Sequence, residues 1–119
     1  MADVLIIDDD SLICDILVRM MEKLGHKSRF ALTGKEGVEL AKNGMFDLVF
    51  LDVMLPDANG LDLIKPIKAT ASAPEIIIIT GNSNPDGAEL AIKSGAWNYL
   101  GKPFLRQDLN LQVSRALQF

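Results

Sequence analysis

The sequence predicts an α/β fold in which a five-stranded parallel sheet is covered by five helices, distributed over both faces. Short apolar runs rich in Val, Ile and Leu alternate with longer segments whose apolar residues recur every three to four positions. The runs at 48–51 and 76–79 are apolar at every position, which is typical of strands buried on both faces. Such alternation of strands and helices favours right-handed crossovers and therefore a parallel sheet.

The first half of the chain contains two strand–helix units. A strand over 4–7 precedes a helix that Ser11 can cap and that continues to Leu24, where Gly25 supplies a stop signal. A weaker strand over 28–32 is expected at an edge of the sheet, and Thr33 is expected to cap a second helix that ends near Lys42. The inward face of the first helix is expected to consist of Leu12, Ile13, Ile16, Leu17, Met20, Met21 and Leu24.

The second half continues the alternation. Pro66 lies inside the third helix and removes a backbone donor, so we expect that helix to be kinked or short. Gly, Asn, Ser and Pro dominate 81–87, which predicts a loop. The expected elements are a strand ending at Leu51, a loop over 52–60, a helix from about 61, a strand over 76–79, the loop over 81–87, a helix over about 86–93, a strand over 97–100 and a last helix over about 105–117.

The composition predicts one cytoplasmic domain over residues 1–119, with no output domain in this chain. The chain has 119 residues and a formal net charge of −4, with no basic block, which argues against direct binding of nucleic acid. No apolar run is long enough to span a bilayer, and the N-terminus has no secretion signal. Cys14 is the single cysteine, which excludes an internal disulfide and fits a reducing compartment.

Polar side chains suited to phosphoryl chemistry follow four of the predicted strands. Asp8 and Asp9 follow the first strand, Asp52 the third, Thr80 the fourth and Lys102 the fifth. In an open parallel sheet the ligand crevice lies outside the carboxyl ends of the strands, so these side chains are expected to meet there. Carboxylates can accept a phosphoryl group, and their hard oxygens suit Mg²⁺. The sequence therefore predicts a crevice for a metal ion and a phosphoryl group.

With these residues in place, the chain resembles the receiver domains of bacterial two-component response regulators from Val4 to about Leu117. The motifs that carry the resemblance are Asp8-Asp9, Asp52, Thr80 and Lys102-Pro103-Phe104, in that order. The resemblance implies a flavodoxin-like, doubly wound sheet of strand order 2-1-3-4-5 with five helices. It also implies a cis peptide bond before Pro103.

The resemblance further implies a role for each site residue. Asp52 would be the phosphoacceptor for a histidine kinase or phosphotransfer protein, and Lys102 would bind the phosphoryl group. Asp8, Asp9, Asp52 and the backbone carbonyl of Met54 would bind Mg²⁺. Such a domain catalyses only its own phosphorylation and autodephosphorylation.

The resemblance also implies a two-state switch and a surface that reports its state. Thr80 would move toward the phosphate, and Tyr99 would turn inward behind it. The face formed by the fourth helix, fifth strand and fifth helix would then bind a downstream output domain or protein, or a second copy of the chain.

Three other functions are alternatives to this interpretation. A phosphatase or mutase of the haloacid-dehalogenase type needs a second acid two residues after its nucleophile, where this chain has Met54. An FMN carrier with the same fold needs a phosphate-binding loop where Asp8, Asp9 and Asp10 would repel phosphate. An interaction-only receiver that signals without phosphorylation remains the alternative. A purely structural interpretation would have the three acids only cap the first helix. Asp10, with Ser11, is expected to serve that cap and to lie outside the metal site.

Overall fold

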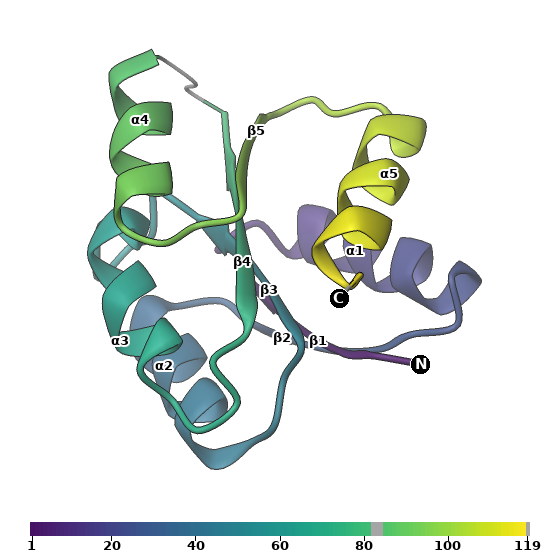
Figure 1. Cartoon of the computed structure of the whole chain (residues 1–119), viewed down its shortest axis with the longest axis horizontal. Coiled ribbons are helices and arrows are strands. Elements are labelled where there is room, and N and C mark those ends of the chain that lie inside the picture. The colour runs from purple at the N-terminus through teal and green to yellow at the C-terminus, as the bar shows by residue number, and fades with distance from the viewer. Residues whose placement is uncertain (82–84, 119) are drawn as a thin grey trace.

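The computed structural model describes residues 1–81 and 85–118 and contains one parallel sheet of strand order β2-β1-β3-β4-β5, as predicted (Figure 1). Part of the loop expected over 81–87 lies outside the described residues. The elements are β1 (Asp3–Ile7), α1 (Ser11–Lys23), β2 (Lys27–Ala31), α2 (Gly34–Asn43), β3 (Leu48–Asp52), the 3-10 turn η1 (Gly60–Leu63), α3 (Ile64–Lys68), β4 (Glu75–Thr80), α4 (Pro85–Lys93), β5 (Asn98–Gly101) and α5 (Arg106–Ala116).

The sheet lies between two helical layers, with α1 and α5 on one face and α2, α3 and α4 on the other (Figure 1). Side chains alternate between the two faces. In β1, Val4 and Ile6 pack into the cluster on the α1/α5 side, whereas Leu5 and Ile7 pack into the opposite cluster. All four side chains are fully buried, and each contributes roughly 1.5–3 kcal/mol of hydrophobic free energy. The near-continuous apolar runs of the sequence reflect this burial on both faces.

The N-terminus of α1 is capped by one of the two residues expected to serve the cap. Asp10 is the N-cap, and its side chain accepts a hydrogen bond of 2.9 Å from the backbone N–H of Leu12. The extended backbone at Asp10 allows its carboxylate to reach the helix end, whereas Ser11 is already the first residue of the helix. At the other end Gly25 has a φ of +84°, so the predicted stop signal is confirmed.

The apolar face of α1 is narrower than the sequence predicts. Leu12 is 65% exposed and Ile16 is 40% exposed, although both were expected in the core. The buried stripe is centred on Leu17 and Met21, and at about 100° per residue Ile16 and Leu12 lie more than about 100° around the helix from its centre. Leu24 lies beyond the last helical residue and is also exposed. Cys14 occupies the inward position instead and is buried.

The remaining elements agree with the prediction to within a residue or two, except that the helix expected from about 61 begins as the 3-10 turn η1 and α3 starts only at Ile64. Strand β2 is at the edge of the sheet, and Thr33 caps α2 by accepting a hydrogen bond from the N–H of Glu36. Helix α3 is short and contains Pro66 within its five residues. The Lys102–Pro103 peptide bond is cis, as the resemblance implies. Among the described residues, no helix has the length and apolar character that a bilayer crossing requires.

Candidate functional site

The carboxyl ends of β1 and β3 bring two aspartates side by side. Ile7 pairs with Leu51 in the parallel register, so Asp8 and Asp52 follow on neighbouring strands. The N–H of Asp8 still donates to the carbonyl of Ala31 at 3.1 Å, which extends the ladder with β2 by one residue. Both aspartates are therefore held by the backbone of the sheet, which makes their separation rigid.

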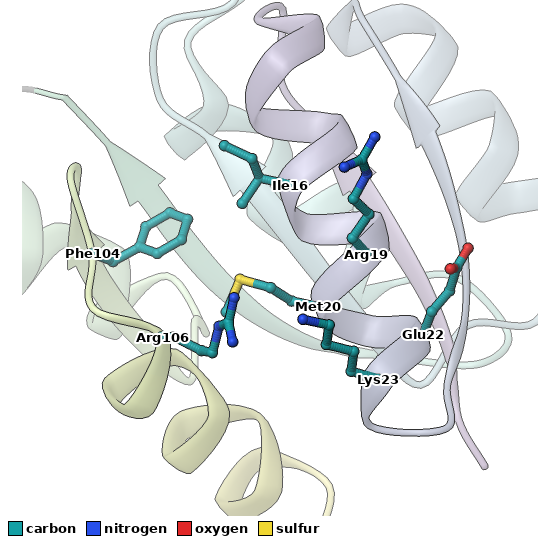
Figure 2. Close-up of a pocket in the computed structure, with 7 residues that line it drawn as sticks. All are labelled: Ile16, Arg19, Met20, Glu22, Lys23, Phe104 and Arg106. Carbon is teal, nitrogen blue, oxygen red and sulfur yellow. The ribbon is translucent and has the colours of Figure 1, made fainter.

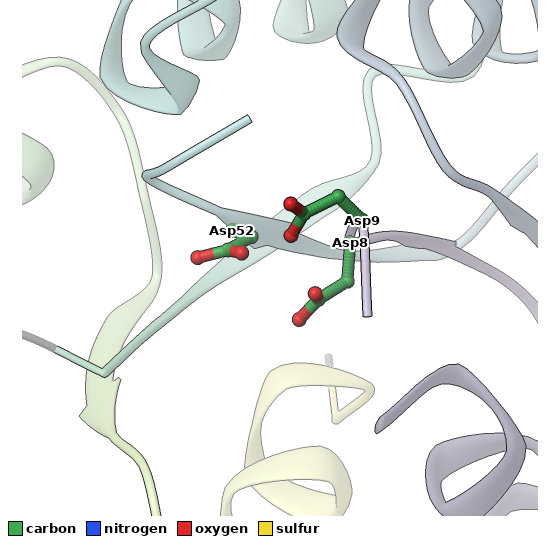
Figure 3. Close-up of side chains that lie close together, drawn as sticks. All are labelled: Asp8, Asp9 and Asp52. Atoms are coloured by element: carbon green, nitrogen blue, oxygen red, sulfur yellow. The ribbon is translucent and has the colours of Figure 1, made fainter. Parts of the chain in front are cut away.

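Three carboxylates gather at this edge of the sheet. One oxygen from each of Asp8, Asp9 and Asp52 lies within 4.8 Å of the others (Figure 3). Asp8 and Asp52 are buried, while Asp9 is exposed at the rim. Two carboxylates about 4 Å apart repel by about 4 kcal/mol at an effective dielectric constant of 20, so the cluster needs positive charge. Oxygen ligands in this number and arrangement suit a hard divalent cation.

Lys102 supplies one positive charge inside the cluster. Its Nζ donates to Asp8 Oδ2 at 2.7 Å and to Asp52 Oδ2 at 3.5 Å. The backbone N–H of Lys102 donates to the carbonyl of Thr80 at 2.7 Å, which holds the residue against the end of β4. One ammonium cannot balance three carboxylates, and the excess negative charge favours a further cation.

Burial and the neighbouring charges shift the pKa values of Asp52 and Lys102. Burial raises the pKa of Asp52 to about 6, the charge of Asp8 adds to the increase, and Lys102 opposes it. Burial also acts against the charge of Lys102, but its hydrogen bond to Asp8 and the charges of both carboxylates outweigh burial and raise its pKa. The Lys102 ammonium is thus charged at neutral pH, and Asp52 ionises at a cost.

Thr80 and Tyr99 lie on the opposite face of the sheet from the acidic cluster. Residues two positions apart on a strand share a face, and Ile6, Phe50 and Leu100 pack on the α1/α5 side. Two residues further along the chain, Asp8, Asp52 and Lys102 are therefore directed to the α1/α5 side as well. The same argument directs Thr80 and Tyr99 to the side of α2, α3 and α4.

Thr80 and Tyr99 are also diagonal neighbours across two strands. Thr80 pairs with Gly101 and Ile78 pairs with Tyr99, so the two side chains can contact along one face. Thr80 is buried, and Tyr99 is half-buried against the α2/α3/α4 cluster. The two residues thus lie close enough in the sheet for one to respond to the other, and their switching role remains a prediction.

The loop after β3 holds Met54 beside the acids. The N–H of Met54 donates to Asp52 Oδ1 at 3.4 Å, while its side chain is 65% exposed. Gly60 closes the base of the loop, and a Cβ at this position would collide with the backbone carbonyl oxygen of Asp52. Glycine is therefore required for the loop to return so close to the end of β3.

Asp57, in the same loop, is a residue that sequence reasoning missed. Its carboxylate accepts hydrogen bonds from the backbone N–H groups of Gly34 and Lys35, at the start of α2. In the sequence Asp57 belongs to an ordinary turn-forming segment, Pro56 to Gly60, and its partners are remote. The only local feature of the sequence that could have indicated a role for Asp57 is its carboxylate directly after Pro56.

A separate groove lies between α1 and the segment leading into α5. Its volume is about 600 Å³, and Phe104 points across it toward Ile16 and Met20 (Figure 2). The rim carries three cationic side chains and one acidic one. The lining residues are Ile16, Arg19, Met20, Glu22, Lys23, Phe104 and Arg106.

Comparison with known proteins decides the family. The sequence model of the family described as the response regulator receiver domain matches residues 4–114 of this chain. The chain belongs to this family. Receiver domains are signalling modules of two-component systems, so the match confirms both the resemblance and the class of function.

Known receiver domains match this one over nearly its full length. It is 35% identical over 115 residues to the transcriptional regulatory protein ZraR of Klebsiella oxytoca, covering 97% of this chain and 26% of that protein. The receiver domain thus spans about a quarter of the length of the ZraR proteins that it matches.

Solved structures of receiver domains share the fold. The beryllofluoride-activated NtrC4 receiver domain dimer has a TM-score of 0.92 and 34% identity, covering 98% of this chain and 97% of that one. A response regulator from Burkholderia pseudomallei, with a phosphorylated aspartic acid, a calcium ion and citrate, has a TM-score of 0.87 and 31% identity. That match covers 99% of this chain and 67% of the other.

Proposed function

We propose that this receiver domain is a phosphorylation-controlled switch in which Asp52 accepts the phosphoryl group. The observation that carries the proposal is the position of Lys102, whose Nζ bridges the buried carboxylates of Asp8 and Asp52 at the carboxyl edge of the sheet. The phosphorylated aspartic acid in the related Burkholderia pseudomallei protein supports this chemistry. The donor would be a histidine kinase or phosphotransfer protein.

In the proposed reaction a carboxylate oxygen of Asp52 attacks the phosphorus atom of a phosphohistidine. The new P–O bond forms as the P–N bond breaks, and the imidazole leaves with the electron pair of that bond. Lys102 then donates to an equatorial oxygen of the transferred group instead of to Asp52. Asp8 retains its ion pair with Lys102 and keeps the ammonium aimed at the reacting centre.

The residues around Asp52 fit Mg²⁺. Asp8, Asp9, Asp52 and the backbone carbonyl of Met54 would hold the ion through hard oxygen atoms, which is the donor set that Mg²⁺ prefers. The bound ion would neutralise negative charge on the phosphoryl oxygens. The calcium ion in the Burkholderia pseudomallei structure supports a divalent cation in this family.

Two surfaces are proposed for partners. Leu12, Met54 and Leu105 are each more than 60% exposed and follow the site residues closely in the chain, so a protein donor that covers the crevice would bury them. The second surface is the face formed by α4, β5 and α5. Leu90 of α4 and Leu111 of α5 are about half exposed and would contact an output domain, an output protein or a second copy of the chain. The NtrC4 receiver dimer supports the last possibility.

We further propose that residues 1–119 form a single receiver domain that works in the cytoplasm. Its catalysis would be limited to its own phosphorylation and autodephosphorylation. The alternative is an interaction-only receiver that signals without phosphorylation. The complete set of Asp8, Asp9, Asp52, Thr80 and Lys102 favours the phosphorylated form, because binding alone requires none of this chemistry.

Beryllofluoride and acetyl phosphate test the proposal directly. With Mg²⁺, acetyl phosphate should add the mass of one phosphoryl group to the protein, and peptide mapping should locate it on Asp52. Beryllofluoride with Mg²⁺ should change the fluorescence of Trp97, which is 43% exposed just before β5. Neither effect should occur without a divalent cation. If neither occurs with Mg²⁺, the protein is an interaction-only receiver.

Met54 should set the lifetime of the aspartyl phosphate. Its thioether is exposed beside Asp52 and cannot orient an attacking water well. We predict that Met54→Asn shortens the phosphoryl lifetime roughly threefold to tenfold, well below the full contribution of a positioned general base. The measurement is loss of radiolabelled phosphoryl group over time. Met54→Leu is the matched control and should keep the wild-type lifetime; equal lifetimes in all three proteins would refute the prediction.

A further inference from the structure

The N-terminus of α2 is capped in part by another segment of the chain. A helix leaves its first four backbone N–H groups without partners inside the helix. Here Gly34 donates to Asp57 Oδ1 at 2.7 Å and Lys35 donates to Asp57 Oδ2 at 2.9 Å. Glu36 donates to the side chain of Thr33, and the bond from the N–H of Gly37 to the Thr33 carbonyl is the first one of the helix itself. Of the three N–H groups at Gly34, Lys35 and Glu36 that lack a partner within the helix, two therefore donate to Asp57.

Asp57 lies at the tip of the loop that carries Met54. At the base of that loop the N–H of Gly60 donates to the carbonyl of Val53 at 2.7 Å. Nearer the tip the N–H of Leu55 donates to the carbonyl of Ala58 at 3.2 Å. Met54 lies between these two hydrogen bonds, so its position depends on both ends of the loop.

The loop tip and the N-terminus of α2 are in van der Waals contact, in addition to the hydrogen bonds that the charged Asp57 accepts. A Cβ added to Gly34 would lie 3.2 Å from Asp57 Oδ1 and 3.3 Å from the Cβ of Ala58. A carboxylate at a helix N-terminus is also stabilised by the helix dipole. The hydrogen bonds from Gly34 and Lys35 lower the pKa of Asp57, so the carboxylate remains charged at neutral pH. The loop tip is thus fixed to a rigid helix.

We propose that Asp57 is a positioning residue that anchors the loop to α2 and thereby holds the Met54 carbonyl in place for the metal ion. The inference rests on the proposed function, because it concerns the Mg²⁺ site. Asp57 itself does not touch the metal; it acts through the backbone of residues 53–60. Helix α2 contributes no side chain to the acidic cluster. Through Asp57 it would nevertheless fix the position of one metal ligand, the backbone carbonyl of Met54.

The test compares two variants that remove caps from the same helix end. Asp57→Ala removes two hydrogen bonds that join the loop to α2, whereas Thr33→Ala removes a side-chain cap within the α2 segment itself. Both should lower stability to a similar extent. Mg²⁺ affinity, measured by calorimetry, should fall roughly threefold to tenfold in Asp57→Ala only. This is less than the 10–100-fold typical of groups that contact a metal ligand directly.

Amide hydrogen exchange without metal gives an independent measurement of the anchor. The N–H groups of Leu55 and Gly60 should exchange faster in Asp57→Ala and at the wild-type rate in Thr33→Ala. Equal Mg²⁺ affinities in these two variants would overturn the proposal. If the wild type bound no Mg²⁺, the proposed function would fail, and the exchange rates would still support or refute the anchor.

Asp57→Asn separates anchoring from simple loss of charge. Asn keeps one side-chain oxygen that can accept from Gly34 or Lys35, so Mg²⁺ affinity should lie between those of the wild type and Asp57→Ala. If Asp57→Asn bound Mg²⁺ as weakly as Asp57→Ala while Leu55 and Gly60 kept wild-type exchange, the effect would be due to charge, and the positioning role would be wrong.

Discussion

Replacing Asp52 by Asn is expected to abolish phosphorylation and, at the same time, to stabilise the folded protein at neutral pH. The first effect follows because the amide has no nucleophilic carboxylate. The second follows because Asp52 is buried beside Asp8, which raises its pKa from 3.8 to about 6. An ionised Asp52 therefore opposes folding, and Asn removes that charge without a large change of volume.

The sign of the pH dependence follows from this raised pKa. Below pH 3.8 Asp52 is protonated in both the folded and the unfolded state and costs nothing. As the pH rises through about 6, the unfolded state ionises first, so the stability of the wild type falls relative to that of Asp52→Asn. Above that pH the difference should be constant, on the order of 2–3 kcal/mol.

Urea unfolding at several pH values, without divalent cations, measures this difference. The gain in Asp52→Asn should be near zero at pH 4 and largest at pH 7. Asp62→Asn is the matched control because Asp62 is exposed outside the cluster, and it should show no such gain. Adding Mg²⁺ should stabilise the wild type more than Asp52→Asn, because the variant lacks one metal ligand. A gain that did not depend on pH would refute the electrostatic explanation.

Local patterns predicted most of the fold and the central part of the site. The apolar runs at 48–51 and 76–79 identified buried strands because parallel strands covered on both faces have no polar side. Asp52 and Lys102 could be placed together because strand ends meet at one edge of the sheet. These inferences need only the chain direction and the succession of strands along the chain, both of which a sequence contains, whereas the order of the strands in the sheet came from the family resemblance.

The parts that could not be predicted depend on tertiary contacts. Leu12 and Ile16 have the correct helical spacing for the core, but the width of the stripe that α1 buries is fixed by the sheet and α5. Asp57 caps α2 across a long sequence separation, and no periodicity connects the two segments. The division of the site, with Lys102 on one face and Thr80 on the other, required the register of β4 and β5.

Replacing Lys102 by Met should strongly destabilise the protein in the absence of divalent cations. The Lys102 side chain is 18% exposed, and its ammonium is hydrogen-bonded to Asp8, whose side chain is fully buried. Removing one partner of a buried ion pair leaves the other charge uncompensated, and here two further carboxylates lie nearby. We expect a loss of about 2–4 kcal/mol at pH 7, decreasing toward pH 4 as Asp52, whose pKa is raised by burial, becomes protonated. Lys102→Arg keeps the charge and should lose less.

The same substitution should strengthen Mg²⁺ binding, although it removes a group needed for phosphorylation. Lys102 and the metal ion are both cations that compete for the carboxylates of Asp8 and Asp52, so removing the ammonium removes a repulsion. Calorimetry should give a lower Kd for Mg²⁺ in Lys102→Met than in the wild type. Added Mg²⁺ should then recover more stability in the variant, by mass action. A variant with wild-type stability and wild-type Mg²⁺ affinity would show that Lys102 does not balance the acidic cluster, and the charge-compensation argument for this site would fail.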